Sequence, residues 1–213
     1  MDARHLTSAE AARRSIEAGF HDPPAFRAAL LAVPAGERDT WADLVLGLDE
    51  LPPDGPALPP GGVPYLPCSV EVLLQLVDEA RVDANDVFVD VGAGAGRAMA
   101  LVHLLTGAGA LGLEIQPELV RTAHDLSARL GLSHVRCIEG DAATIAAYTV
   151  AGSVFFFNCP FSGARLDKVL DELEPIARTR PLRVGCVYLP LPPRPWLTRT
   201  PGPVGELEIY RST

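Results

Sequence analysis

The sequence predicts an α/β fold: a mostly parallel β-sheet with helices on both faces, an antiparallel hairpin at its C-terminal edge and a helical segment ahead of it. Short apolar runs alternate with amphipathic stretches from residue 69 onward. The runs are continuous rather than alternating in polarity, which is typical of parallel strands buried on both faces. No helical stretch separates the last two runs, so these strands are expected to lie antiparallel.

Size and composition favour a soluble globular protein. The chain has 213 residues, enough for one domain or for one domain with an N-terminal appendage. Hydrophobic residues make up 48% and charged residues 21%, which excludes wholesale disorder. No apolar run approaches the roughly 20 residues that cross a bilayer, and no secretory signal is recognised. The four cysteines are widely spaced, as expected for reduced thiols in a cytoplasmic protein.

The first fifty residues predict three short helices. Thr7 or Ser8 can cap the first, which Gly19 ends; the second opens at Pro23, and the third covers 38–48.

A proline-rich segment, residues 51–67, separates these helices from the rest of the chain. Its seven prolines exclude a helix or a central strand, so it is expected to be an extended linker. We therefore divide the chain into residues 1–60, a helical N-terminal cap with its linker, and residues 61–213, the ligand-binding domain.

Beyond the linker the elements follow in a regular order. Strands are predicted over 86–91, 110–115, 134–138, 153–157, 182–189 and 205–210. Helices are expected to begin near Ser69, Arg97 and Pro117, and a fourth carries the apolar stripe Leu166, Val169, Leu170, Leu173 and Ile176. A proline-rich loop, 190–203, precedes the last strand.

A glycine loop follows the first predicted strand and opens a helix. Gly92, Gly94 and Gly96 let the backbone turn tightly and approach a ligand, while the helix N-terminus offers free N–H groups. A dinucleotide fingerprint would need glycine where the chain has Arg97. Asp90, two residues before the first glycine, suits a cationic ligand such as a sulfonium with an α-amino group.

Acidic residues also follow the next two predicted strands. Glu114 can bind both hydroxyls of a ribose, a contact expected for dinucleotide and adenosyl ligands alike. Asp141 can accept a hydrogen bond from an adenine amine, and the backbone N–H of Ala142 can donate to a ring nitrogen. Aspartate is also a common turn residue, so Asp141 is interpreted as a ligand-binding residue only because the other two motifs precede it.

The fourth predicted strand ends in Asn158-Cys159-Pro160-Phe161. Ligands of open α/β folds bind at the carboxyl edge of the sheet, where this tetrapeptide is expected to lie. An amine that donates to the Asn158 side-chain oxygen would keep its lone pair free to attack a methyl sulfonium. The alternative is a simple turn, since asparagine and proline are turn residues.

Together these motifs resemble the class I S-adenosylmethionine-dependent methyltransferases, over residues 63–180. The segments VFVDVGAGAGRA, LGLEIQPELV and IEGDAA resemble the cofactor motifs of that superfamily, and NCPF resembles the N-P-P-Y/F motif of enzymes that methylate amines and amides. The chain looks closest to bacterial proteins distantly similar to the disruptor-of-telomeric-silencing type of lysine methyltransferase, which carry a loop similar to VPYLPCS, residues 63–69.

The resemblance implies a Rossmann-like seven-stranded sheet, S-adenosylmethionine as cofactor and S-adenosylhomocysteine as product. It also implies a role for each matching residue. Asp90, Gly92, Gly94 and Gly96 would hold the methionine part, Glu114 the ribose, Asp141 and Ala142 the adenine, and Tyr65 would close over the cofactor. Asn158 would orient the acceptor in a slot shaped by Pro160 and Phe161. Cys159, however, replaces the first proline of N-P-P-F.

The function predicted from these observations is methyl transfer to an amine. Protein lysine, a base amine and a small metabolite all remain open as acceptors, although the net charge of −9 argues against bare nucleic acid. Cys159 motivates a second hypothesis, a non-catalytic cofactor-binding module. A third hypothesis, a nicotinamide-dependent oxidoreductase, is disfavoured by Arg97.

The cap is predicted to cover the cofactor and to help form the acceptor pocket. No membrane partner is expected, the oligomeric state is open, and the five histidines lack metal-ligand spacing.

Overall fold

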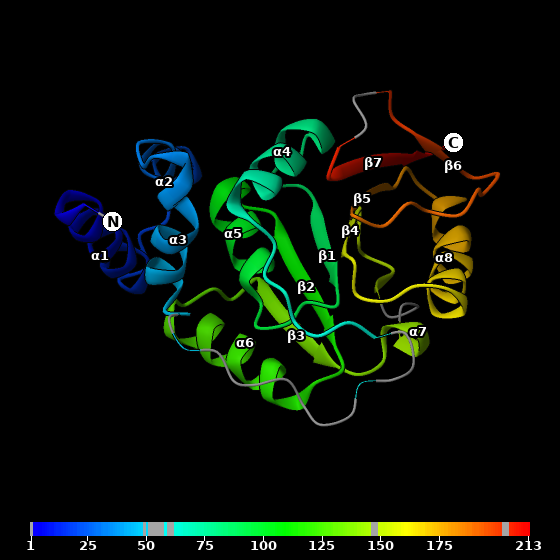
Figure 1. Cartoon of the computed structure of the whole chain (residues 1–213), viewed down its shortest axis with the longest axis horizontal. Coiled ribbons are helices and arrows are strands. Elements are labelled where there is room, and N and C mark those ends of the chain that lie inside the picture. Colours follow the sequence, from blue (N-terminus) through cyan, green and yellow to red (C-terminus); the bar gives the residue numbers. More distant parts are fainter. Residues whose placement is uncertain (1, 49, 51–57, 59–61, 146–148, 202–204) are drawn as a thin grey trace.

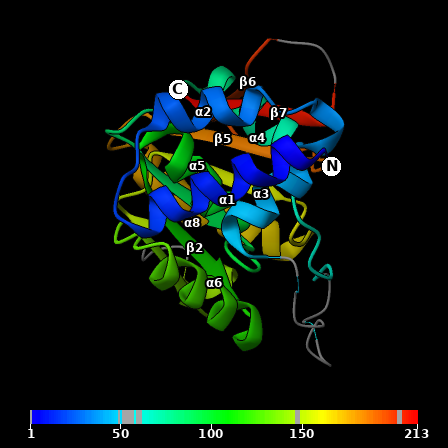
Figure 2. The same ribbon diagram turned by 90° about the vertical axis from the view of Figure 1, so that its left-hand side faces the viewer.

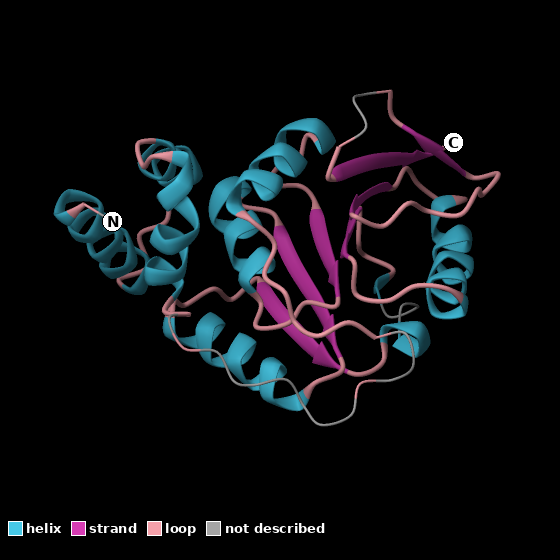
Figure 3. Ribbon diagram, in the orientation of Figure 1, coloured by secondary structure: helices cyan, strands magenta, loops and turns pink. Residues whose placement is uncertain are grey.

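The computed structural model describes residues 2–48, 50, 58, 62–145, 149–201 and 205–213. Its centre is a β-sheet with helices on both faces (Figures 1 and 3). The sheet order is β3-β2-β1-β4-β5-β7-β6. Strands β1 to β5 run parallel, whereas β7 is antiparallel to both β5 and β6. The predicted fold class, with its antiparallel C-terminal edge, is confirmed.

The strands lie within one or two residues of the predicted apolar runs, except for an additional short strand in the proline-rich loop. They are β1 (Val87–Val91), β2 (Gly109–Glu114), β3 (Val135–Glu139), β4 (Val154–Asn158), β5 (Arg183–Val187), β6 (Leu197–Arg199) and β7 (Leu207–Ser212). The prediction of a proline-rich loop over 190–203 is therefore wrong at 197–199, where β6 forms and pairs with β7.

The helices begin and end largely where the capping residues predict. They are α1 (Ala3–Glu17), α2 (Pro23–Leu31), the 3-10 turn η1 (Ala35–Glu37), α3 (Arg38–Leu46), α4 (Val70–Ala80), α5 (Arg97–Thr106), α6 (Pro117–Arg129), α7 (Ala142–Ile145) and α8 (Ala164–Ala177). Ser69 caps α4 by accepting the Val72 N–H. The first helix starts earlier than predicted, because Asp2 caps it through the Arg4 N–H and Thr7 bonds back to Ala3 within it.

One hydrophobic core lies on each face of the sheet. Phe88 and Phe156 belong to the core under α4, α5 and α6, whereas Phe155 and Phe157 belong to the core under α8. Helices α1 to α3 form a further layer outside α4 and α5 and share the first of these cores (Figures 1 and 2).

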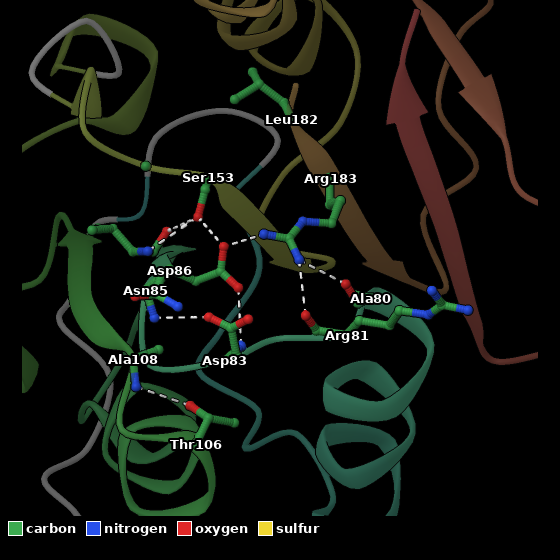
Figure 4. Close-up of polar contacts among 12 residues, drawn as sticks. Ala80, Arg81, Asp83, Asn85, Asp86, Thr106, Ala108, Ser153, Leu182 and Arg183 are labelled. Atoms are coloured by element: carbon green, nitrogen blue, oxygen red, sulfur yellow. Dashed lines mark hydrogen bonds and ion pairs between the residues drawn. The ribbon is translucent and has the colours of Figure 1, made fainter. Parts of the chain in front are cut away.

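A polar network closes the amino edge of the sheet, opposite the expected site (Figure 4). The Arg183 guanidinium on β5 pairs with the Asp86 carboxylate and donates to the backbone carbonyls of Ala80 and Arg81 at the end of α4. The Ser153 hydroxyl donates to the same Asp86 carboxylate over 2.7 Å. The network joins three strands to α4 at this edge, which leaves the carboxyl edge for ligands.

Candidate functional site

The carboxyl edge of the sheet brings together nearly all residues predicted to bind the cofactor or the acceptor. A segment that we call the strap, residues 62–68, crosses this edge in extended conformation. Two small cavities, of about 60 and 20 Å³, lie beneath it. Tyr65, Leu66, Gly92 and Asn158 line both cavities.

The strap lies directly on the glycine loop, and so does the predicted acceptor loop, residues 158–161. Gly92 and Gly94 have φ angles of +86° and +55°, which favour glycine. A Cβ atom on Gly92 would lie 2.5 Å from Cβ of Pro160, and one on Gly94 would lie 1.9 Å from Cε2 of Tyr65. Gly96 instead faces α6, where a Cβ would come within 2.9 Å of Ala123 Cβ. Only the first two glycines therefore form the floor of the site.

Asp90 and Glu114 place two carboxylates beside this floor, in different environments. Glu114 accepts hydrogen bonds of 2.8 Å from the backbone N–H groups of Gly94, Ile115 and Gln116. Asp90 is 3% exposed and lines the smaller cavity, and none of the described residues donates a hydrogen bond to its carboxylate. Burial, and next the charge of Glu114, raise the pKa of Asp90 to about 8. Asp90 is thus a buried acid that forms no ion pair with any of the described residues, because Arg97, which lines the same cavity, pairs with Asp39 and Asp43 instead.

The third acidic residue is held by an arginine that the sequence analysis did not single out. Asp141 Oδ1 accepts the Ala143 N–H and bonds to Nη2 of Arg165 over 2.6 Å. The Arg165 guanidinium also lies 5.3 Å from the centre of the Phe161 ring, a cation–π geometry. Ala142, Phe161 and Arg165 line the larger cavity, whereas Asp141 is not part of its lining.

The acceptor loop is tied to the strap. Asn158 Nδ2 donates to the Leu66 carbonyl over 2.8 Å, and the Val63 N–H donates to the Pro160 carbonyl over 3.2 Å. Cys159 has a φ of +48°, a left-handed conformation that costs a non-glycine residue about 1–2 kcal/mol. Proline is locked near −65° and is excluded from it. The NCPF backbone therefore differs here from any sequence with proline at this position.

Arg97, the residue that breaks the dinucleotide fingerprint, joins the N-terminal helices to the site. Its guanidinium pairs with Asp39 and Asp43 on α3 and donates to the Cys68 carbonyl of the strap. None of the described residues 2–48 lines either cavity, whereas the strap lines both. The prediction that the cap helps to form the pocket is thus wrong for its helices, which pack behind the glycine loop on α4 and α5.

The described residues contain no cluster of three or more His, Cys, Asp or Glu side chains suited to a metal ion. Within the same residues, no helix combines the length and the apolarity needed to span a bilayer.

No protein-family model and no curated protein sequence matches the chain. Among solved structures, the methyltransferase-like protein yhhF of Escherichia coli is 17% identical, with a TM-score of 0.56, over 70% of this chain and 90% of that one. A structure concerned with the conversion of a disulfide bond into a thioacetal group in echinomycin biosynthesis has a TM-score of 0.52 at 14% identity, over 66% and 81% of the two chains. An RNA methyltransferase from Salinibacter ruber, bound to S-adenosyl-L-homocysteine, is 23% identical, with a TM-score of 0.49, over 69% and 92%. The chain has the fold of the class I S-adenosylmethionine-dependent methyltransferases.

Proposed function

We propose that this protein is an S-adenosylmethionine-dependent methyltransferase that acts on an amine. The observation that carries the proposal is the buried Asp90 carboxyl group beside the glycine loop, which has no partner among the described residues. The α-ammonium group of the cofactor would supply the missing positive charge. An ionised Asp90 carboxylate would repel a pyrophosphate, so the same position is a poor match for a dinucleotide.

The surrounding residues suit the other parts of the cofactor. Gly92 and Gly94 would lie under the methionine part, Glu114 keeps one lone-pair site on Oε2 for a ribose hydroxyl, and Asp141 and Ala142 stand on the adenine side. The sites of small ligands typically measure about 300–1,000 Å³. Because Tyr65 and Pro160 now pack on the glycines, the strap must shift before a nucleoside enters.

Asn158 supports an acceptor that donates a hydrogen bond. The Leu66 carbonyl can only accept, so the Asn158 amide nitrogen faces it and Oδ1 faces away. Oδ1 can accept a hydrogen bond from an N–H group of the acceptor while the lone pair of the acceptor nitrogen stays free.

The similarity to the disruptor-of-telomeric-silencing type of enzyme is also part of this proposal. It rests on the strap with Tyr65 and on Asn158 at the end of β4.

Two alternatives make different predictions. A non-catalytic module would bind the cofactor without transfer, and the left-handed Cys159 backbone favours it over a conventional amine site. A nicotinamide oxidoreductase would bind NAD, but the buried carboxyl group of Asp90 and the Arg97 contacts to α3 both disfavour it.

Titration calorimetry separates these possibilities. S-adenosylhomocysteine should bind and NAD should not; the reverse result would refute the proposal. Glu114→Ala should weaken S-adenosylhomocysteine binding by about 1.5–3 kcal/mol, because charged hydrogen bonds to the ribose are lost. Glu139, the exposed register partner of Glu114 on β3, provides the control, and Glu139→Ala should leave the affinity unchanged.

The amine assignment is tested at Asn158, with an acceptor found by radiolabelled methyl transfer into a lysate. Asn158→Ala should keep cofactor affinity within about threefold and lower the transfer rate roughly 100-fold, because a group that positions the acceptor is lost. A wild-type rate in this variant would leave NCPF as a turn and remove the amine from the proposal.

A further inference from the structure

A second site-sized cavity adjoins the acceptor loop at Cys159. Its volume is about 460 Å³, within the range of small-molecule sites. Its lining is mostly apolar and includes Leu166, Leu189, Pro190, Leu191 and Pro192. Cys159 lines both this cavity and the larger cavity beneath the strap, so the two are adjacent.

Two left-handed residues frame this second cavity. Asn158 on β4 and Val187 on β5 are register partners, and the residue after each, Cys159 and Tyr188, has a φ of +48°. Among the described residues, Arg81 alone of the other non-glycines has a positive φ. The neighbouring strands β4 and β5 therefore end at the same position along the sheet, and the loops that follow them line the cavity. Strain of this kind is concentrated at functional sites.

Tyr188 presents an aromatic ring to this cavity. Its side chain is 69% exposed, among the highest values for large hydrophobic residues in the described part of the chain. The Tyr188 N–H donates to the Glu206 carbonyl over 3.0 Å, and its hydroxyl is hydrogen-bonded to the Glu206 carboxylate. The ring is thus anchored at its hydroxyl although the residue is largely open to solvent, which suits stacking with another ring.

The charges around the cavity select against two kinds of acceptor. Asp167 is the one charged side chain in its lining, and Arg194 pairs with both Asp167 and Asp171. No unpaired cation is thus available among the lining residues for a phosphate or carboxylate. No histidine lines the cavity either, and its one carboxylate, Asp167, is engaged by Arg194, so an alkylammonium would find no free base in the lining to remove its proton.

We infer, on the basis of the proposed function, that the acceptor is an arylamine whose ring lies in this cavity against Tyr188. An arylamine is neutral at pH 7 and needs no base before attack. Its nitrogen lone pair forms the new N–CH₃ bond while the S–CH₃ bond breaks and leaves its electrons on sulfur. One N–H donates to Asn158 Oδ1 during attack, and water takes the proton that the product ammonium then loses.

A pair of isomers tests this inference with the full-length protein. p-Toluidine carries its amino group on the ring, whereas benzylamine carries it on a methylene and is an ammonium at neutral pH. Radiolabelled methyl from S-adenosylmethionine should enter p-toluidine and enter benzylamine at least tenfold more slowly. Calorimetry should detect p-toluidine binding to the complex with S-adenosylhomocysteine.

Variants of Tyr188 locate the ring. Tyr188→Ala should raise the KM for p-toluidine about tenfold with little change in kcat, and Tyr188→Phe, which keeps the ring, should raise it much less. Phe20→Ala is the matched control, because Phe20 is 73% exposed in the turn between α1 and α2 and lines neither the cavities under the strap nor this one.

The outcomes distinguish this inference from the proposed function. Failure of wild-type protein to bind S-adenosylhomocysteine would remove the proposed function itself. If S-adenosylhomocysteine binds but p-toluidine neither binds nor is methylated, or if benzylamine or a transfer-RNA probe is preferred, the arylamine site is overturned and the methyltransferase proposal stands.

Discussion

The ring of Tyr65 occupies the space that a side chain at Gly94 would need. A Cβ atom on Gly94 would lie 1.9 Å from Tyr65 Cε2 and 2.1 Å from Cδ2. The strap and the glycine loop are therefore complementary surfaces, and contact between them depends on the absence of a side chain.

Gly94→Ala should displace the strap and weaken S-adenosylhomocysteine binding at least tenfold, since both the φ of +55° and the Tyr65 contact oppose a methyl group. Gly131→Ala is the matched control: Gly131 has a φ of +64°, but a Cβ there would have no neighbour within 4 Å. Backbone strain should lower the Tm of both variants, as measured by thermal unfolding. Loss of the strap contact should weaken S-adenosylhomocysteine binding in Gly94→Ala only, as measured by calorimetry. Equal affinities would contradict the contact.

The raised pKa of Asp90 predicts that cofactor binding releases a proton. At pH 7 a carboxyl group with a pKa of about 8 is mostly protonated, and a nearby ammonium group would lower that pKa. S-adenosylhomocysteine titrations in phosphate and in Tris, which differ in ionisation enthalpy, should give different apparent enthalpies at pH 7 and converge above about pH 9. Identical enthalpies in both buffers at pH 7 would argue against the ion pair.

The same shift predicts a conflict between stability and binding. The unfolded carboxyl group ionises near pH 3.8 and the folded one near pH 8, so stability falls as pH rises between these values, by about 1.4 kcal/mol per unit at most. Asp90→Asn should therefore raise Tm at pH 7 while it weakens S-adenosylhomocysteine binding. Thermal unfolding at pH 5 and pH 8 tests the sign, because the gain in Tm should be larger at pH 8.

The Arg97 contacts predict that the N-terminal helices stabilise the strap. Asp43→Asn removes one of two carboxylates from a buried guanidinium and should cost about 1–3 kcal/mol. Asp78→Asn is the control, since Asp78 joins α4 to Arg27 on α2 through an exposed ion pair that is worth under about 1 kcal/mol. Limited proteolysis of the strap should be faster in Asp43→Asn only; equal cleavage would uncouple the helices from the site.

Three histidines predict acid sensitivity where the N-terminal helices pack on α5. The His103 ring stacks on His21 at 5.3 Å and lies 6.4 Å from His134. Burial, with smaller contributions from His21 and His134, lowers the pKa of His103, so stability is lost as pH falls below the unfolded value near 6.5. His103→Gln should reduce the fall in Tm between about pH 7.5 and about pH 5.5. The exposed His124→Gln should not, and an unchanged fall in both variants would assign the acid sensitivity elsewhere.

Most of the sheet could be predicted because buried parallel strands are continuous apolar runs. The short β6 strand could not, since three residues inside a proline-rich segment carry no period and gain their pairing only from β7. The start of α1 was missed because Asp2 and Thr7 are equally good caps in sequence, and only the structure shows which one bonds to a free N–H.

The placement of residues at the carboxyl edge was predictable where a motif sits at a strand end, as with Asp90, Glu114 and Asn158. The contacts that tie it together join residues far apart in the chain: Arg97 with Asp43, Arg165 with Asp141, and Leu66 with Asn158. No local pattern encodes such pairs. The sequence shows that Cys159 replaces a proline of the motif. Only the structure shows the consequence, a left-handed backbone that proline could not adopt.

The strap has a consequence for the order of events in turnover. It contacts the glycine loop through Tyr65 and the acceptor loop through Val63 and Leu66, so neither loop is released while the strap stays in place. Lifting it for the nucleoside also breaks the bond from the Asn158 amide nitrogen to the Leu66 carbonyl, so the orientation that aims Oδ1 at the acceptor is set only after the strap has closed over the cofactor. Steady-state kinetics should therefore be compulsory-ordered, with cofactor on first and S-adenosylhomocysteine off last, and the product should inhibit competitively against the cofactor alone.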